Sequence, residues 1–119
     1  MYFVDRAAVV IKPTELFLTW LKSVEKEGLD LTLAQLRSDC TVLMVPECDE
    51  PEDVIAFVDE HYEAIFKAEL AAWYESPKDW PEDMSLKAFW AFFDVEINST
   101  VLDLVDEPMH NIPVVDNMM

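Results

Sequence analysis

The side chains of this chain that could do chemistry are mainly carboxylates, and they are concentrated in one stretch. Residues 47–75 hold ten acidic side chains against one basic side chain, Lys67. Glu69 falls inside the apolar side of the helix predicted there, and a buried carboxylate with a shifted pKa marks a candidate active site. An acid–base enzyme could use Glu69 with His61, but eight residues span about 12 Å along a helix, too far for direct contact.

The structural interpretation of Glu69 is the favoured one. Its carboxylate would reach a Tyr or Trp donor or Arg6, or the helix would bend and expose it, since a buried carboxylate without a partner is costly.

Two cysteines, Cys40 and Cys48, flank a short apolar run that is typical of a strand. An extended chain places them roughly 26 Å apart, far beyond disulfide reach. We therefore expect free thiols. The alternative, a metal site or a reactive cysteine paired with His61, is disfavoured because no second Cys or His lies at ligand spacing.

The single glycine, Gly28, excludes several kinds of site. Phosphate-binding loops, dinucleotide fingerprints and helix–loop–helix calcium loops all require glycines at fixed positions. Asp49-x-Pro51-x-Asp53 resembles the start of a calcium loop, but a proline replaces a ligand and the turn glycine is absent. The sequence predicts no metal site and no cofactor.

A long helix over 51–75 would carry most of these carboxylates. Pro51 suits its first turn, and apolar residues then recur at 3.6 spacing. Thr14 and Gly28 would begin and close an earlier helix, while Thr32 and Ser85 would cap two others. Residues 93–106 alternate at period two with a phase slip near 98–100, which a bulge or burial of both faces would explain. The remaining predicted elements are strands at 4–11 and 41–45 and helices at 31–38 and 86–93.

The fold class expected from this order is α+β, or a small α/β fold. It is a compact single domain over 1–107, with a small sheet of about three strands and helices packed on it. Residues 108–119 would form a loosely held tail, in which 112–115 could add a short edge strand. The N-terminus lacks a basic region and no apolar run is long enough to span a membrane, so we expect a cytoplasmic protein.

Charge is distributed unevenly along the chain. Residues 1–46 hold five bases and six acids, whereas residues 47–119 hold three bases and nineteen acids. Such asymmetry points to charged partners. A merely solvated acidic surface would also produce it. Adaptation to high salt is a poorer explanation, because the first half is balanced.

A third explanation is a surface that imitates nucleic acid. A domain of this length is about 35 Å across, and duplex DNA of that length carries roughly 20 phosphate charges. The net charge of the chain is −17. The candidate partner-binding residues are Asp49, Glu50, Glu52, Asp53, Asp59, Glu60, Glu63, Asp94 and Glu96.

In size, acidity and aromatic content the chain resembles the small acidic bacterial DNA-mimic proteins, among them a Neisseria protein that engages the histone-like protein HU. The resemblance implies a non-enzymatic monomer that binds no nucleic acid itself. Its acidic face would instead occupy the DNA-binding surface of a basic, HU-like nucleoid-associated protein.

Overall fold

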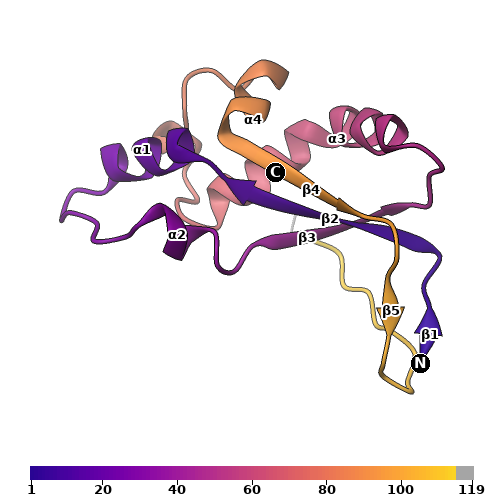
Figure 1. The fold of residues 1–119 in the computed structure, drawn as a ribbon. Coiled ribbons are helices and arrows are strands. Elements are labelled where there is room, and N and C mark those ends of the chain that lie inside the picture. Colours follow the sequence, from indigo (N-terminus) through magenta and orange to yellow (C-terminus); the bar gives the residue numbers. More distant parts are fainter. Residues whose placement is uncertain (115–119) are drawn as a thin grey trace.

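A three-stranded antiparallel sheet forms the centre of the protein, which is described here from a computed structural model over residues 1–114 (Figure 1). The strand order is β3 (Thr41–Pro46), β2 (Arg6–Pro13), β4 (Phe93–Asn98). Along β2 every second residue is buried, from Ala7 to Pro13, so one face of the sheet forms the core. The fold is α+β, as predicted.

Helices cover the core face of this sheet. α1 (Glu15–Val24), α3 (Pro51–Ala71) and α4 (Leu86–Phe92) contribute buried side chains to the same cluster as β2. The ring of Phe66 lies 5.3–5.8 Å from the rings of Phe89, Phe92 and Phe93, centroid to centroid. Two short elements, α2 (Leu33–Leu36) and η1 (Pro77–Asp79), complete the helical part. The packed aromatic residues hold α3 and α4 against the sheet.

Local sequence signals explain most helix starts. Thr32 and Gln35 form a capping box, and the Ser85 hydroxyl accepts a hydrogen bond from the Ala88 amide. Thr14 occupies the N-cap position of α1, but its hydroxyl donates instead to the carbonyl of Ala91 at 2.7 Å. The prediction for Gly28 was wrong: α1 ends at Val24, and Gly28 adopts its positive φ of 84° in the turn that follows.

A second, two-stranded sheet pairs the chain's start with its last part. β1 (Tyr2–Phe3) runs antiparallel to β5 (Leu102–Asp103). The phase slip near 98–100 is therefore the point where the chain leaves the central sheet after β4 and joins β1, not a bulge. In Figure 1 this ribbon projects away from the end of the central sheet.

Residues 106–114 are exposed and contain no helix or strand. The edge strand considered for 112–115 is absent over 112–114, and its last position lies outside the described residues. Across residues 1–114, none of the helices combines the length and apolar character needed to cross a membrane.

Candidate acidic interaction site

Helix α3 and the two residues before Pro51 present most of the predicted carboxylates to solvent. Pro51 occupies its first turn, and Val54, Val58, Phe66 and Leu70 are buried against the sheet and α4. Because the apolar side faces inward, the opposite side of the helix carries the acids. We call the exposed carboxylates at its start and along this side the acidic helix face: Asp49, Glu50, Glu52, Asp53, Glu60 and Glu63.

None of these six carboxylates forms an ion pair within the described part of the chain. The four at the helix start lie where the helix dipole favours negative charge. Glu52 and Glu63 are eleven residues apart, about 17 Å along the axis. The acidic helix face is thus a group of carboxylates, on and just before α3, that no cation of the described residues compensates.

Asp59 has a different environment from its neighbours. It is half-buried, and its carboxylate accepts a hydrogen bond of 2.7 Å from the indole Nε1 of Trp90 on α4. Sequence reasoning placed Asp59 on the polar side of the helix and missed this contact, which depends on how α4 packs. Asp59 therefore joins two helices and is less available to a partner.

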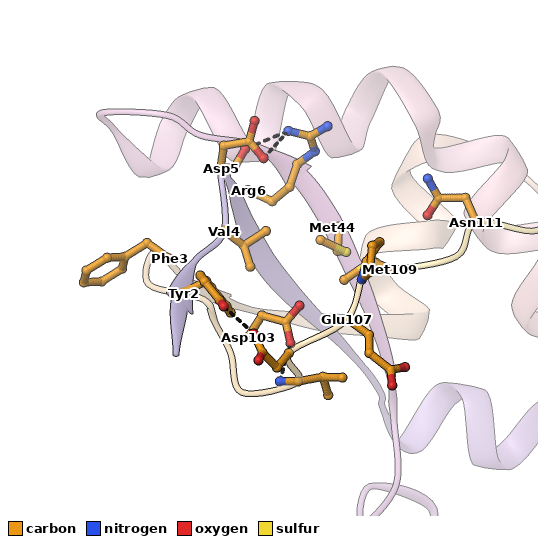
Figure 2. Close-up of a pocket in the computed structure, with 13 residues that line it drawn as sticks. Tyr2, Phe3, Val4, Asp5, Arg6, Met44, Asp103, Glu107, Met109 and Asn111 are labelled. Atoms are coloured by element: carbon orange, nitrogen blue, oxygen red, sulfur yellow. Dashed lines mark hydrogen bonds and ion pairs between the residues drawn. The ribbon is translucent and has the colours of Figure 1, made fainter.

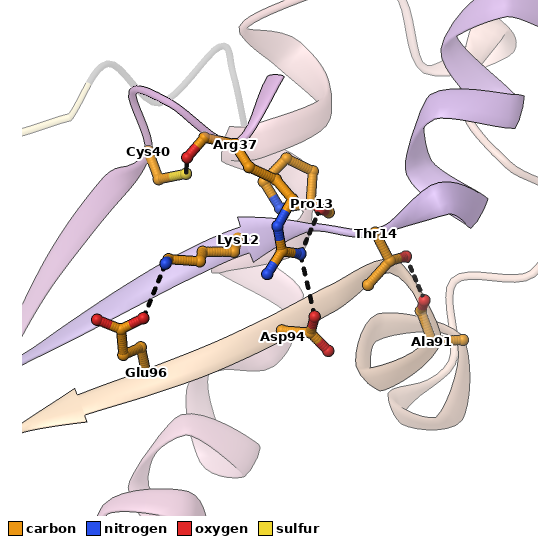
Figure 3. Close-up of polar contacts among 8 residues, drawn as sticks. All are labelled: Lys12, Pro13, Thr14, Arg37, Cys40, Ala91, Asp94 and Glu96. Atoms are coloured by element: carbon orange, nitrogen blue, oxygen red, sulfur yellow. Dashed lines mark hydrogen bonds and ion pairs between the residues drawn. The ribbon is translucent and has the colours of Figure 1, made fainter. Parts of the chain in front are cut away.

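The two candidates on β4 lie on the other face of the sheet. Asp94 accepts a hydrogen bond from the Arg37 guanidinium at 3.0 Å, and the Lys12 ammonium lies 2.8 Å from Glu96 (Figure 3). Arg37 also donates to the carbonyl of Pro13 at 2.9 Å. Because strand residues alternate between faces and Phe93 is buried, Asp94 and Glu96 point away from the helical layer.

The structure thus divides the nine predicted residues rather than joining them. Six form the acidic helix face, and Asp59 accepts a hydrogen bond from Trp90. The two acids on β4 form ion pairs with Lys12 and Arg37. The alternation of apolar and polar residues along β2 and β4 is a sequence signal that could have placed Lys12 and Glu96 on the outward face of the sheet. Their proximity required the strand pairing, which the sequence did not specify.

Glu69 is a half-buried carboxylate at the far end of α3. It lines a cavity of about 80 Å³ with Cys40, Thr41 and Trp73 among others. Burial raises the pKa of Glu69 above its ordinary value of 4.5, and the Thr41 side chain at the same cavity partly offsets this shift. Thr41 is a partner that sequence reasoning did not propose. A cavity of this volume has room for about two or three water molecules.

His61 does not contribute to this cavity. It is exposed, its ring stacks on Phe57 with centroids 4.3 Å apart, and its Nδ1 lies 2.9 Å from the Phe57 carbonyl oxygen. The structure therefore leaves Glu69 and His61 apart.

Both cysteines are free thiols, as predicted. Burial raises the pKa of the Cys40 thiol, whose sulfur lies 3.4 Å from the Arg37 carbonyl oxygen. A raised pKa keeps the thiol protonated and weakly nucleophilic. Within residues 1–114 no three His, Cys, Asp or Glu side chains are grouped so that they could hold a metal ion.

In comparisons with known proteins, no family model, curated protein or solved structure matches the chain.

Proposed function

We propose that this protein is a non-enzymatic interaction protein whose acidic helix face occupies the DNA-binding surface of a basic protein of the HU type. The observation that carries the proposal is the set of six exposed carboxylates on α3 and just before it, none of which forms an ion pair within the described residues. The partner would meet this helix in place of a DNA backbone, in competition with duplex DNA.

The mean density of charge along α3 supports imitation of one DNA strand. The 17 Å between Glu52 and Glu63 corresponds to about five phosphates of a single strand, at 3.4 Å each. Over that length the helix exposes four carboxylates, with Asp49 and Glu50 adding two more just before it. The number of charges per unit length is therefore similar, and α3 holds them on a packed scaffold.

Such binding would be electrostatic, so it should weaken as salt is added. Exposed charges are screened over about 8 Å at physiological ionic strength. Charge complementarity mainly raises the association rate, because it steers the partners before contact. The β4 pair adds little in this proposal, since Lys12 and Arg37 already compensate it.

The test is displacement of a short fluorescent DNA duplex from purified HU, followed by anisotropy at several salt concentrations. The wild-type protein should release the DNA at low salt and progressively less at high salt. The double reversal Glu60→Lys/Glu63→Lys should slow association by about tenfold or more while the fold is kept, since both side chains are exposed.

The matched control is Glu27→Lys/Asp30→Lys, which makes the same change of charge at two exposed residues between α1 and α2. It should displace DNA nearly as well as the wild type. Glu25 is unsuitable as a control, because its carboxylate accepts a hydrogen bond from Tyr74 at 2.8 Å. Failure of the wild type to displace DNA at every salt concentration, with HU and with other basic DNA-binding proteins, would leave the acids as a solvated surface.

A further inference from the structure

A second concave site lies at the end of the molecule formed by the β1–β5 ribbon. The ribbon, the start of β2, Met44 of β3 and residues from 105–109 with Asn111 border an open groove of about 740 Å³ (Figure 2). This volume is within the range of ligand-binding pockets. No residue of the acidic helix face lines it, so the groove is separate from the site proposed above.

The ribbon beside the groove has no core of its own. Both residues of β1 are exposed, and β5 has one exposed and one half-buried residue. Isolated two-stranded ribbons are marginal in water, and stability requires a third strand or a packed face. Within residues 1–114 each strand of this ribbon pairs on one side only, so each also has an edge without a strand partner there.

Apolar side chains line one part of the groove. Met44 of β3 and Met109 of the C-terminal segment both line it, and their side chains lie close together in the view of Figure 2. Their exposed fractions are 46% and 57%, which is unusual for methionine. Methionine side chains adapt to irregular apolar partners, so this pair suits an apolar side chain brought by a ligand.

The charges of the groove define the kind of ligand. Four carboxylates line it against one guanidinium, and that guanidinium, Arg6, is paired with Asp5 at 3.0 Å. Of the other three, Asp106 accepts a hydrogen bond from the Tyr2 hydroxyl and Asp103 accepts one from the Val105 amide. Within the described residues neither of these two carboxylates, nor that of Glu107, is paired with a cation. A second copy of this chain, with net charge −17, would be repelled.

We propose that this groove binds an extended basic peptide segment that carries an apolar side chain. The peptide pairs its backbone with a free edge of the β1–β5 ribbon, as in strand addition. Its apolar side chain packs on Met44 and Met109, and its Lys or Arg side chains face Asp103, Asp106 and Glu107. The ribbon then gains the third strand that it lacks.

The probe is a fluorescein-labelled, amidated hexapeptide that alternates lysine with valine and phenylalanine. Anisotropy should show saturable one-to-one binding to the wild-type protein. Two control peptides, with glutamate in place of lysine or serine in place of the apolar residues, should bind at least tenfold more weakly, because each lacks one of the two complementary features.

Two groove variants separate the contributions. Asp103→Asn/Glu107→Gln keeps the shape, and should weaken binding about threefold to tenfold. Met44→Ser/Met109→Ser should weaken it about fivefold or more. The matched control, Glu60→Gln/Glu63→Gln on the acidic helix face, removes two charges elsewhere and should change binding less than twofold. All three variants should leave the far-UV circular dichroism unchanged.

Four results would each overturn the proposal: no binding of the lysine peptide, equal binding of the serine peptide, equal loss in the acidic-helix control, or a dimer in sedimentation that the methionine variant abolishes. The last would show that a second copy covers the groove. Because DNA displacement from HU is measured separately, the groove proposal and the proposed function can fail independently.

Discussion

At the scale of single residues, Glu69 is the carboxylate whose environment differs most from that of the other acids. The others described are largely solvated, whereas Glu69 lies against the cavity near Thr41 and Cys40. Desolvation disfavours its charged form, which is why its pKa is raised. We infer a structural role for it, because its cavity is too small for a substrate.

The sign of its effect on stability follows from the raised pKa. Between the unfolded-state pKa, near 4.5, and the higher folded-state pKa of Glu69, the folded protein binds more protons than the unfolded chain. The free energy of unfolding therefore falls as pH rises through this window. Above the window, the full cost of keeping the charged Glu69 carboxylate partly desolvated is present.

Glu69→Gln keeps the shape of the protonated side chain and removes the cost of desolvating a charged carboxylate. We expect the variant to be more stable than the wild type at pH 7 and nearly equal to it below pH 4.5. Urea unfolding of both proteins across this pH range checks the difference, in which the other carboxylates cancel. A variant less stable than the wild type at pH 7 would mean that the charged form has a stabilising partner.

At the scale of elements, α4 is the piece that ties the layers together. Its C-terminus passes directly into β4, and the Phe92 and Ala91 carbonyls accept hydrogen bonds from the Thr14 amide and hydroxyl. Trp90 then connects α4 to α3 through Asp59. A single short helix thus contacts the β2–α1 junction and the helix that carries the acidic face.

The Asp59–Trp90 contact can be measured by substitution. Asp59→Ala leaves the half-buried indole N–H without its acceptor, and should lower the free energy of unfolding by about 1–3 kcal/mol. Asp59→Asn keeps an acceptor and should cost much less. Chemical denaturation monitored by tryptophan fluorescence compares the two variants. Similar losses in both would show that the charge of Asp59, rather than the hydrogen bond, provides the stability.

At the scale of the whole molecule, self-repulsion is the dominant electrostatic property. A net charge of −17 on 119 residues destabilises the compact state, because the carboxylates are closer together in the folded protein than in the unfolded chain. Among the described residues three acids form ion pairs with cations: Asp5, Asp94 and Glu96. Most of the charge is compensated only by mobile counterions.

Added sodium chloride should therefore raise the melting temperature. Between about 0.01 M and 0.15 M salt the screening length falls from about 30 Å to 8 Å, and each 1 kcal/mol gained corresponds to about 4 °C in a protein of this size. Differential scanning calorimetry measures the shift. Glu60→Gln/Glu63→Gln, with two fewer charges, should show a smaller shift than the wild type. A melting temperature that does not change with salt would contradict this account.

Much of this protein was predictable from its sequence, because the signals are local. The periodicity of 51–75 identified α3, although α3 ends at Ala71, and Ser85 marked the start of α4. The solvent-facing acids on α3 followed from the same periodicity. The 26 Å between extended cysteines correctly predicted free thiols.

The tertiary structure decided which charges remain uncompensated. Lys12 and Arg37 meet Glu96 and Asp94 only because β2 pairs with β4 and α2 is followed by a turn at the sheet's end. Trp90 reaches Asp59 only through the packing of α4 on α3. Thr41 lies at the same cavity as Glu69 only because β3 packs against α3. The β1–β5 ribbon joins residues about a hundred positions apart, and no local pattern specifies such a pairing. Periodicity assigns a side chain to a face, but only packing decides what that face meets.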